Sequence, residues 1–168
     1  FIESGDHVVV GVNGFFGARI AEIAARYGAD VTPLQKPWGQ VFSPDELEST
    51  LKKRSTKILA LVHAETSTGA LQPMDGIGEL ARRHGALLLL DTVTSLSGVP
   101  LQVDDWGVDI AYSASQKCLS CPPGLAPITV SDRAREIIQR RETTVANWYL
   151  DLSLIERYWD ENRTYHHT

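Results

Sequence analysis

Residues 114–124 read Ala-Ser-Gln-Lys-Cys-Leu-Ser-Cys-Pro-Pro-Gly, a run of small and polar residues around a single lysine, Lys117. They follow an apolar segment, residues 108–112, that is typical of a short buried strand. The two prolines and the glycine exclude a continuing helix and stiffen the loop. We expect a lysine at the end of a buried strand to have little water around it, which disfavours its ammonium form. The neutral amine is the nucleophile of Schiff-base chemistry with a carbonyl or with pyridoxal phosphate (PLP).

A second segment brings a carboxylate to the same region. Residues 87–90 are four leucines between Gly85 and Asp91, a pattern typical of a strand that is buried on both faces of a parallel sheet. An ionised carboxylate at the end of such a strand is costly unless it meets a cation or several donors. Because ligands of open α/β sheets bind at the carboxyl ends of the strands, we expect Asp91 and Lys117 to face one crevice. A carboxylate for a pyridinium nitrogen and a lysine for an aldehyde carbon are the minimum pair for a PLP enzyme.

These segments, together with one more, carry a family resemblance. Ser-Ala-Ser-Gln-Lys at residues 113–117 with Pro-Pro-Gly at 122–124, Asp-Thr-Val at 91–93 and His-Ala-Glu-Thr-Ser-Thr-Gly at 63–69 resemble the class V aminotransferases. Within that family the chain is similar to the alanine–glyoxylate, serine–pyruvate (serine–glyoxylate) aminotransferase branch, across essentially all of its length. The resemblance implies the α/β fold of the fold type I PLP-dependent transferases, with a mostly parallel sheet flanked by helices.

The resemblance also implies a set of site residues. Lys117 would hold the cofactor as a Schiff base, and Asp91 would hold the nitrogen of its ring. Phe16 and Val93 would pack against opposite faces of the pyridine ring, with Phe16 in place of the tryptophan that many family members carry. The other implied cofactor contacts are Thr66, Gln116, Tyr165 and Thr168. The last two would reach the cofactor of the neighbouring subunit in a homodimer.

By the same resemblance the activity is transamination of a small amino acid, alanine or serine, with a 2-oxo acid such as glyoxylate or pyruvate. Family members are longer than this chain, which begins at Phe1 and has its one methionine at Met74. We therefore expect residues 1–168 to be a single domain, the central part of the PLP-binding large domain. The family's N-terminal segment and C-terminal small domain would be absent, and this part alone would be inactive.

The composition argues against several classes of function. The 168 residues, 43% of them hydrophobic, are enough for one domain with a sizeable core. A net charge of −5 without a basic stripe argues against nucleic acid or an acidic membrane surface as the main partner. No apolar run approaches the ~20 residues of a membrane span. Two cysteines do not make a disulfide framework, so a reducing, cytoplasmic setting is favoured, and an organelle stays open.

The start of the chain supports a rival interpretation. Residues 7–10 predict a strand, residues 11–17 (Gly-Val-Asn-Gly-Phe-Phe-Gly) a glycine-rich turn into a helix, and residues 31–34 a second strand. The glycines resemble the dinucleotide fingerprint, in which the helix N-terminus receives a pyrophosphate. Residues 34–36, Leu-Gln-Lys, offer no carboxylate for the ribose. A nicotinamide-binding, Rossmann-like module therefore stays an alternative, as does a non-catalytic scaffold of the same fold.

Cys118 and Cys121 form a Cys-x-x-Cys pair, which would normally suggest a redox or zinc site. No second pair completes a zinc site, and the segment does not open a helix as thioredoxin-type motifs do. A cysteine desulfurase or another class V lyase is the alternative within PLP chemistry, but it needs a cysteine on a mobile loop. His63 and Glu65 have no further ligands at suitable spacing, so we expect no metal site.

The middle of the chain carries local signals for regular structure. Ser43, Pro44 and Glu46 predict a helix that begins with a capping box. Further predicted elements are a buried strand over residues 58–62, a helix over 74–84, a strand over 125–130 and a helix over 131–141.

Overall fold

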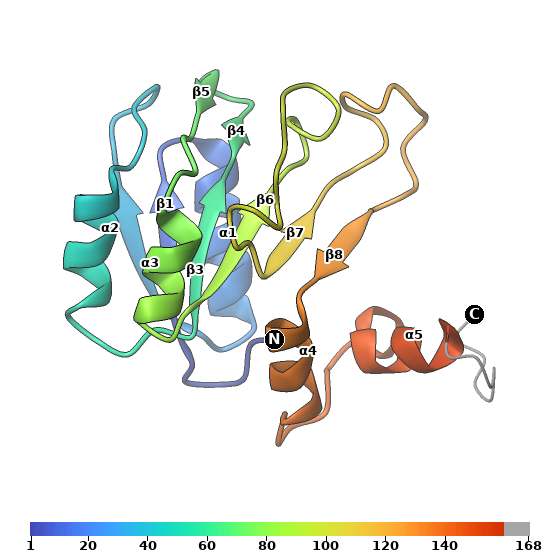
Figure 1. Cartoon of the computed structure of the whole chain (residues 1–168). Helices are drawn as coiled ribbons and strands as arrows, with labels where there is room; N and C mark the ends of the chain where they lie inside the picture. The colour runs from blue at the N-terminus through green and yellow to red at the C-terminus, as the bar shows by residue number, and fades with distance from the viewer. Residues whose placement is uncertain (160–168) are drawn as a thin grey trace.

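The structure, a computed structural model, describes residues 1–159 and is organised around a six-stranded sheet (Figure 1). In spatial order the strands are β2 (Asp30–Gln35), β1 (His7–Val12), β3 (Ile58–Val62), β6 (Leu87–Asp91), β7 (Ile110–Tyr112) and β8 (Ile128–Val130). The pairs from β2 to β7 are parallel, and β8 pairs with β7 antiparallel. The predicted α/β class with a mostly parallel sheet is confirmed.

Helices cover both faces of this sheet (Figure 1). Helix α1 (Phe15–Arg26) lies on one face, and α2 (Pro44–Leu51) and α3 (Ile77–Arg83) lie on the other. Successive strand residues point to opposite faces, so each strand contributes to both cores. The α2/α3 face buries Val9, Leu59, Leu61, Leu88 and Leu90, whereas the α1 face buries Val8, Val10, Ile58, Ala60 and Leu87. Strands that are apolar on both faces are what the leucine run predicted.

The remaining elements lie around the sheet. A short hairpin of β4 (Ala64–Glu65) and β5 (Ala70–Leu71) follows β3 at the carboxyl edge. Helix α4 (Asp132–Gln139) joins the core of the α1 face through Ala134, and a 3-10 turn, Trp148–Leu150, leads to α5 (Leu152–Trp159).

Two predicted elements are shorter in the structure. Helix α3 begins only at Ile77, because Gly76 adopts a left-handed backbone conformation (φ 73°) that interrupts the helix before it. The strand predicted over 125–130 is formed only from Ile128, because Pro127 has no N–H to donate and the Leu125 N–H donates to the Ser115 side chain rather than to a backbone carbonyl.

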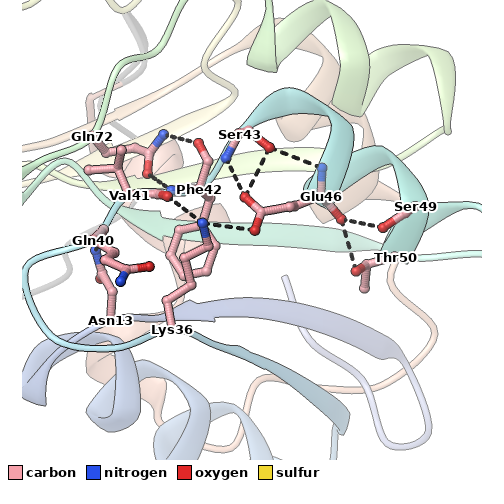
Figure 2. Close-up of polar contacts among 10 residues, drawn as sticks. All are labelled: Asn13, Lys36, Gln40, Val41, Phe42, Ser43, Glu46, Ser49, Thr50 and Gln72. Carbon is pink, nitrogen blue, oxygen red and sulfur yellow. Dashed lines mark hydrogen bonds and ion pairs between the residues drawn. The ribbon is translucent and has the colours of Figure 1, made fainter.

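The predicted capping box at the start of α2 is present (Figure 2). The Glu46 N–H donates to Ser43 Oγ (3.3 Å), and the Ser43 N–H donates to Glu46 Oε2 (2.8 Å). Lys36 extends the network, since its Nζ donates to the Val41 carbonyl (2.9 Å) and pairs with Glu46 Oε1 (2.8 Å). These contacts fasten the loop of residues 36–43 to the start of α2, on the face of the sheet opposite α1.

Helix α1 lies very close to β1 because Gly17 has no side chain at the contact. A Cβ atom at Gly17 would lie 2.4 Å from the carbonyl oxygen of Gly11, a backbone atom that cannot rotate away. Gly17 therefore serves close helix–strand packing, which places the first turn of α1 at the carboxyl edge of the sheet.

Candidate active site

A cavity of about 600 Å³ lies on the α1 face of the sheet and reaches its carboxyl edge; Val8 and Ile58, near the other ends of their strands, also line it. The predicted site residues that line it are Phe16, Asp91, Val93, Gln116 and Lys117. The pairing of β6 with β7 brings Asp91 and Lys117 to the same cavity. Asp91 and Tyr112 are register partners at the ends of these strands, and the lysine loop (residues 113–127) begins directly after Tyr112. The chain thus brings an acid and an amine from separate strands to one cavity.

Asp91 is a buried carboxyl group with two neutral donors. Its Oδ1 accepts from the Val93 N–H (2.9 Å), and its Oδ2 accepts from the Tyr112 hydroxyl (2.7 Å). Burial raises the pKa of Asp91 above its ordinary value, and the charge of Glu65 adds to this, while the two hydrogen bonds and Arg19 act in the opposite direction. Burial and the neighbouring Asp91 also raise the pKa of Tyr112, so its hydroxyl stays a donor. A buried carboxylate of this kind is suited to a cationic atom of a ligand.

Lys117 lies in the loop between β7 and β8, and its side chain is exposed. The expectation of little water around it is wrong for this chain, because the loop leaves the sheet beyond β7. The loop is held by Ser115, which is buried: its Oγ donates to the Pro122 carbonyl (2.7 Å) and accepts from the Leu125 N–H (3.3 Å). Its N–H also donates to the Leu125 carbonyl (3.1 Å). Ser115, besides the two prolines, fixes the path of the lysine loop.

Thr66 is not among the residues that line the cavity. It is exposed in the turn between β4 and β5, where its hydroxyl donates to Thr94 Oγ1 (3.2 Å). Thr94 Oγ1 in turn donates to the Ala64 carbonyl (2.6 Å), which ties this turn to the loop that follows Asp91. Thr66 therefore lies beside the site without facing it. Tyr165 and Thr168 lie outside the described residues.

Phe16 enters the cavity from the first turn of α1. The guanidinium of Arg19, one turn further along the helix, lies 5.0 Å from the ring centroid of Phe16 and 5.0 Å from that of Phe15. Arg19 also lines the cavity. The guanidinium thus lines the same cavity as Asp91. Its positive charge acts to lower the pKa of Asp91, whereas burial raises it by more.

Sequence reasoning missed Tyr112 as the partner of Asp91. Tyr112 is the last residue of β7, the strand next to β6, and this position could have indicated the contact. The register that pairs Tyr112 with Asp91 is, however, a long-range property that the sequence does not show. The sequence suggests for Glu65 only the role of a metal ligand, which its spacing to other ligands argues against. In the structure it is 1% exposed and accepts hydrogen bonds from the backbone of Phe16 and Gly17.

The other candidate groups lie elsewhere. The His63 ring packs edge-on against Trp106 (centroids 5.2 Å apart), on the α2/α3 side of the sheet, and burial lowers the pKa of His63. Cys118 and Cys121 are free and exposed. Among residues 1–159, no three His, Cys, Asp or Glu side chains gather where a metal ion could be held. Nor does this described part contain a helix long and apolar enough to cross a membrane.

Known proteins resemble the chain over nearly its whole length. It is 44% identical over 170 residues to alanine–glyoxylate aminotransferase of Oryctolagus cuniculus, an alignment that covers 99% of this chain and 43% of that protein. It is 40% identical over 185 residues to (S)-ureidoglycine–glyoxylate transaminase of Bacillus subtilis, covering 99% of this chain and 44% of that one. The crystal structure of alanine–glyoxylate aminotransferase from Nostoc sp. matches with a TM-score of 0.96 and 60% identity, over 99% of this chain and 44% of that chain.

The chain thus spans less than half the length of these relatives. Residues 1–154 match the family model of the class-V aminotransferases. With that match and 44% identity over nearly all of its residues, the chain belongs to the class-V aminotransferase family.

Proposed function

We propose that the protein containing this chain is a PLP-dependent transaminase, which moves the amino group of alanine or serine to a 2-oxo acid such as glyoxylate or pyruvate. The observation that carries the proposal is that Asp91 and Lys117 line one cavity together with Phe16 and Val93. The names of the relatives support glyoxylate as the acceptor, since they are alanine–glyoxylate and ureidoglycine–glyoxylate enzymes.

The residues present fit PLP. An aromatic and a branched aliphatic side chain, Phe16 and Val93, offer flat apolar contacts for a ring. Asp91 offers a carboxylate for a protonated ring nitrogen, and Lys117 offers a primary amine for an aldehyde. A volume of about 600 Å³ lies within the usual range for small-molecule sites. When bound, PLP supplies an electron sink for the negative charge that develops at the α carbon of the amino acid.

Three side chains of this chain would then have separate roles. Lys117 Nζ would hold the cofactor at its aldehyde carbon, and as a free amine it would accept and donate the proton that leaves the substrate α carbon. Asp91 would face the ring nitrogen and favour its protonated form, since the Val93 N–H and the Tyr112 hydroxyl hold its carboxylate in one orientation. Gln116, which also lines the cavity, would contribute a hydrogen bond to the phosphate or to the ring oxygen.

We further propose that residues 1–168 form part of the cofactor-binding large domain of a homodimer. Tyr165 and Thr168 would reach the cofactor of the neighbouring subunit, and Thr66 would donate to the phenolic oxygen after a small movement of its turn. These roles rest on the family resemblance. The two free, exposed thiols favour a reducing, cytoplasmic compartment.

The test is to add PLP to the purified protein, record the visible absorbance, reduce with borohydride and locate the modified residue by peptide mass. We expect the label on Lys117, and the variant Lys117→Ala should lose both the visible band and the label. Lys53→Ala, which removes an exposed lysine from the turn after α2, is the matched control and should keep both. A label that stays in Lys117→Ala, or full turnover of alanine and glyoxylate by that variant, would refute the proposal.

A further inference from the structure

Of the two buried carboxylates near the cavity, Asp91 and Glu65, Glu65 accepts more hydrogen bonds. It is 1% exposed and lies at the end of β4. Its Oε2 accepts from the backbone N–H groups of Phe16 (3.1 Å) and Gly17 (3.1 Å). Its Oε1 accepts from the N–H (3.2 Å) and the hydroxyl (2.6 Å) of Ser67. Charge-assisted hydrogen bonds to backbone N–H groups are among the strong ones in proteins.

These contacts complete the first turn of α1. The first N–H groups of any helix have no partner within the helix, and Gly14 at the N-cap has no side chain to offer one. Ser67 Oγ accepts from the Phe15 N–H (2.9 Å), and Glu65 takes the next two N–H groups. A Cβ atom at Gly14 would lie 2.4 Å from Glu65 Cγ, so glycine is what lets the carboxylate approach. The cap is therefore supplied by residues about 50 positions later in the chain.

The same contacts explain what the glycine-rich turn does. In a dinucleotide-binding turn, the helix N-terminus receives the negative charge of a pyrophosphate. Here the carboxylate of Glu65 occupies that place. A phosphate would overlap with the atoms of this carboxylate and be repelled by its charge. Residues 11–17 are thus not arranged as a phosphate cradle in this chain, which removes the main support for the nicotinamide interpretation.

We propose that Glu65 is a positioning residue for the cofactor, because it caps α1 at the peptide N–H of Phe16 and so fixes the ring of Phe16 at the cavity wall. The inference rests on the proposed function, since it concerns PLP. Ser67 shares the role through its hydroxyl, which joins the Phe15 N–H to the carboxylate. Both residues act on the cofactor through the helix and neither is expected to touch it.

The experiment measures PLP affinity by titration and the circular dichroism induced in the absorption band of the bound cofactor. In Glu65→Gln one acceptor oxygen becomes an NH2 group that faces donors, so part of the cap is lost. We expect the Kd for PLP to rise about tenfold, as for the loss of one charge-assisted hydrogen bond, and the induced band to change in amplitude. Ser67→Ala should shift both readouts in the same direction by a smaller factor, and it decides the question if Glu65→Gln does not fold.

Glu46→Gln is the matched control, because Glu46 also caps a helix with a carboxylate (Figure 2). Helix α2 lies on the opposite face of the sheet and does not line the cavity. Glu46→Gln should lower the melting temperature and leave the PLP affinity and the induced band unchanged. If stability alone governed PLP binding, both variants would lose affinity in step with their melting temperatures, which would overturn the inference.

A double variant tests whether Glu65 acts through the aromatic ring. In the background Phe16→Ala, the change Glu65→Gln should alter the Kd by less than twofold, because the ring that it positions is gone. If the increase in Kd of the double variant equals the product of the increases in the two single variants, the inference is contradicted. Wild-type affinity and an unchanged band in Glu65→Gln would contradict it as well. Wild-type protein that binds no PLP at Lys117 would refute the proposed function and this inference together, whereas the other negative results leave the proposed function standing.

Discussion

Replacement of Asp91 by asparagine should stabilise the cofactor-free protein and at the same time impair transamination. Asparagine has the same shape and can keep both contacts, since its oxygen accepts from the Val93 N–H and its NH2 group donates to the Tyr112 oxygen. It removes a carboxylate that is only 6% exposed and whose ionised form is disfavoured by burial, which raises its pKa. Burial of this carboxylate costs the folded state free energy, and the charge of Arg19 and the two hydrogen bonds offset that cost only in part.

The gain in free energy of unfolding should be about 0.5–2 kcal/mol, the usual range for a single stabilising substitution. For a chain of this size, each 1 kcal/mol corresponds to about 2–4 °C in melting temperature. The pH dependence follows from the raised pKa. The unfolded carboxyl group ionises near its ordinary pKa of about 3.9, whereas the folded one keeps its proton to higher pH. Wild-type protein therefore loses stability as pH rises through this window, and the advantage of the variant should grow over the same range.

The assay is thermal and urea unfolding of both cofactor-free proteins from about pH 4 to pH 8, where the ordinary aspartate pKa sets the lower limit. Asp109→Asn is the control, because Asp109 is also buried (2% exposed) but pairs with Arg133 at 2.9 Å. Breaking that pair should cost about 3 kcal/mol, the low end for a buried pair, since Arg133 keeps some contact with water. Turnover of Asp91→Asn should fall by about 10²–10³, as for the loss of one electrostatic contact in an active site. Destabilisation of Asp91→Asn, or a gain that does not change with pH, would refute the reasoning.

Three further substitutions test the surroundings of the site. Tyr112→Phe removes a donor to the ionised carboxylate of Asp91, so the pKa of Asp91 should rise further and the acidic limb of the pH–rate profile should move to higher pH; an unmoved limb would contradict the contact. Ser115→Ala should lower stability by about 1 kcal/mol and reduce the borohydride labelling of the lysine loop, measured by melting temperature and peptide mass. Gly17→Ala should cost about 3 kcal/mol in urea unfolding, because its Cβ would lie 2.4 Å from the Gly11 carbonyl oxygen; wild-type stability would show that the helix can shift freely.

Signals that act over a few residues predicted much of the fold. The apolar runs at residues 7–10, 58–62 and 87–90 predicted buried strands, because a strand covered on both faces has to be apolar at nearly every position. The capping box at Ser43 was visible because its donors and acceptors lie within three residues. Predicted boundaries were wrong where the backbone interrupts an element, as the left-handed Gly76 does before α3 and Pro127, which has no N–H, does before β8.

The sequence by itself determined the class of sheet, the positions of the acid and the amine at the ends of their strands, and the family resemblance. Only the tertiary structure decided which groups surround them. The hydroxyl of Tyr112 lies beside Asp91 because of the register of β6 against β7, and Glu65 caps α1 across 48 or 49 positions of the chain. Contacts of this kind depend on how strands and helices pack against one another. Local pattern and composition carry no such information, because the same residues in another register would meet different neighbours.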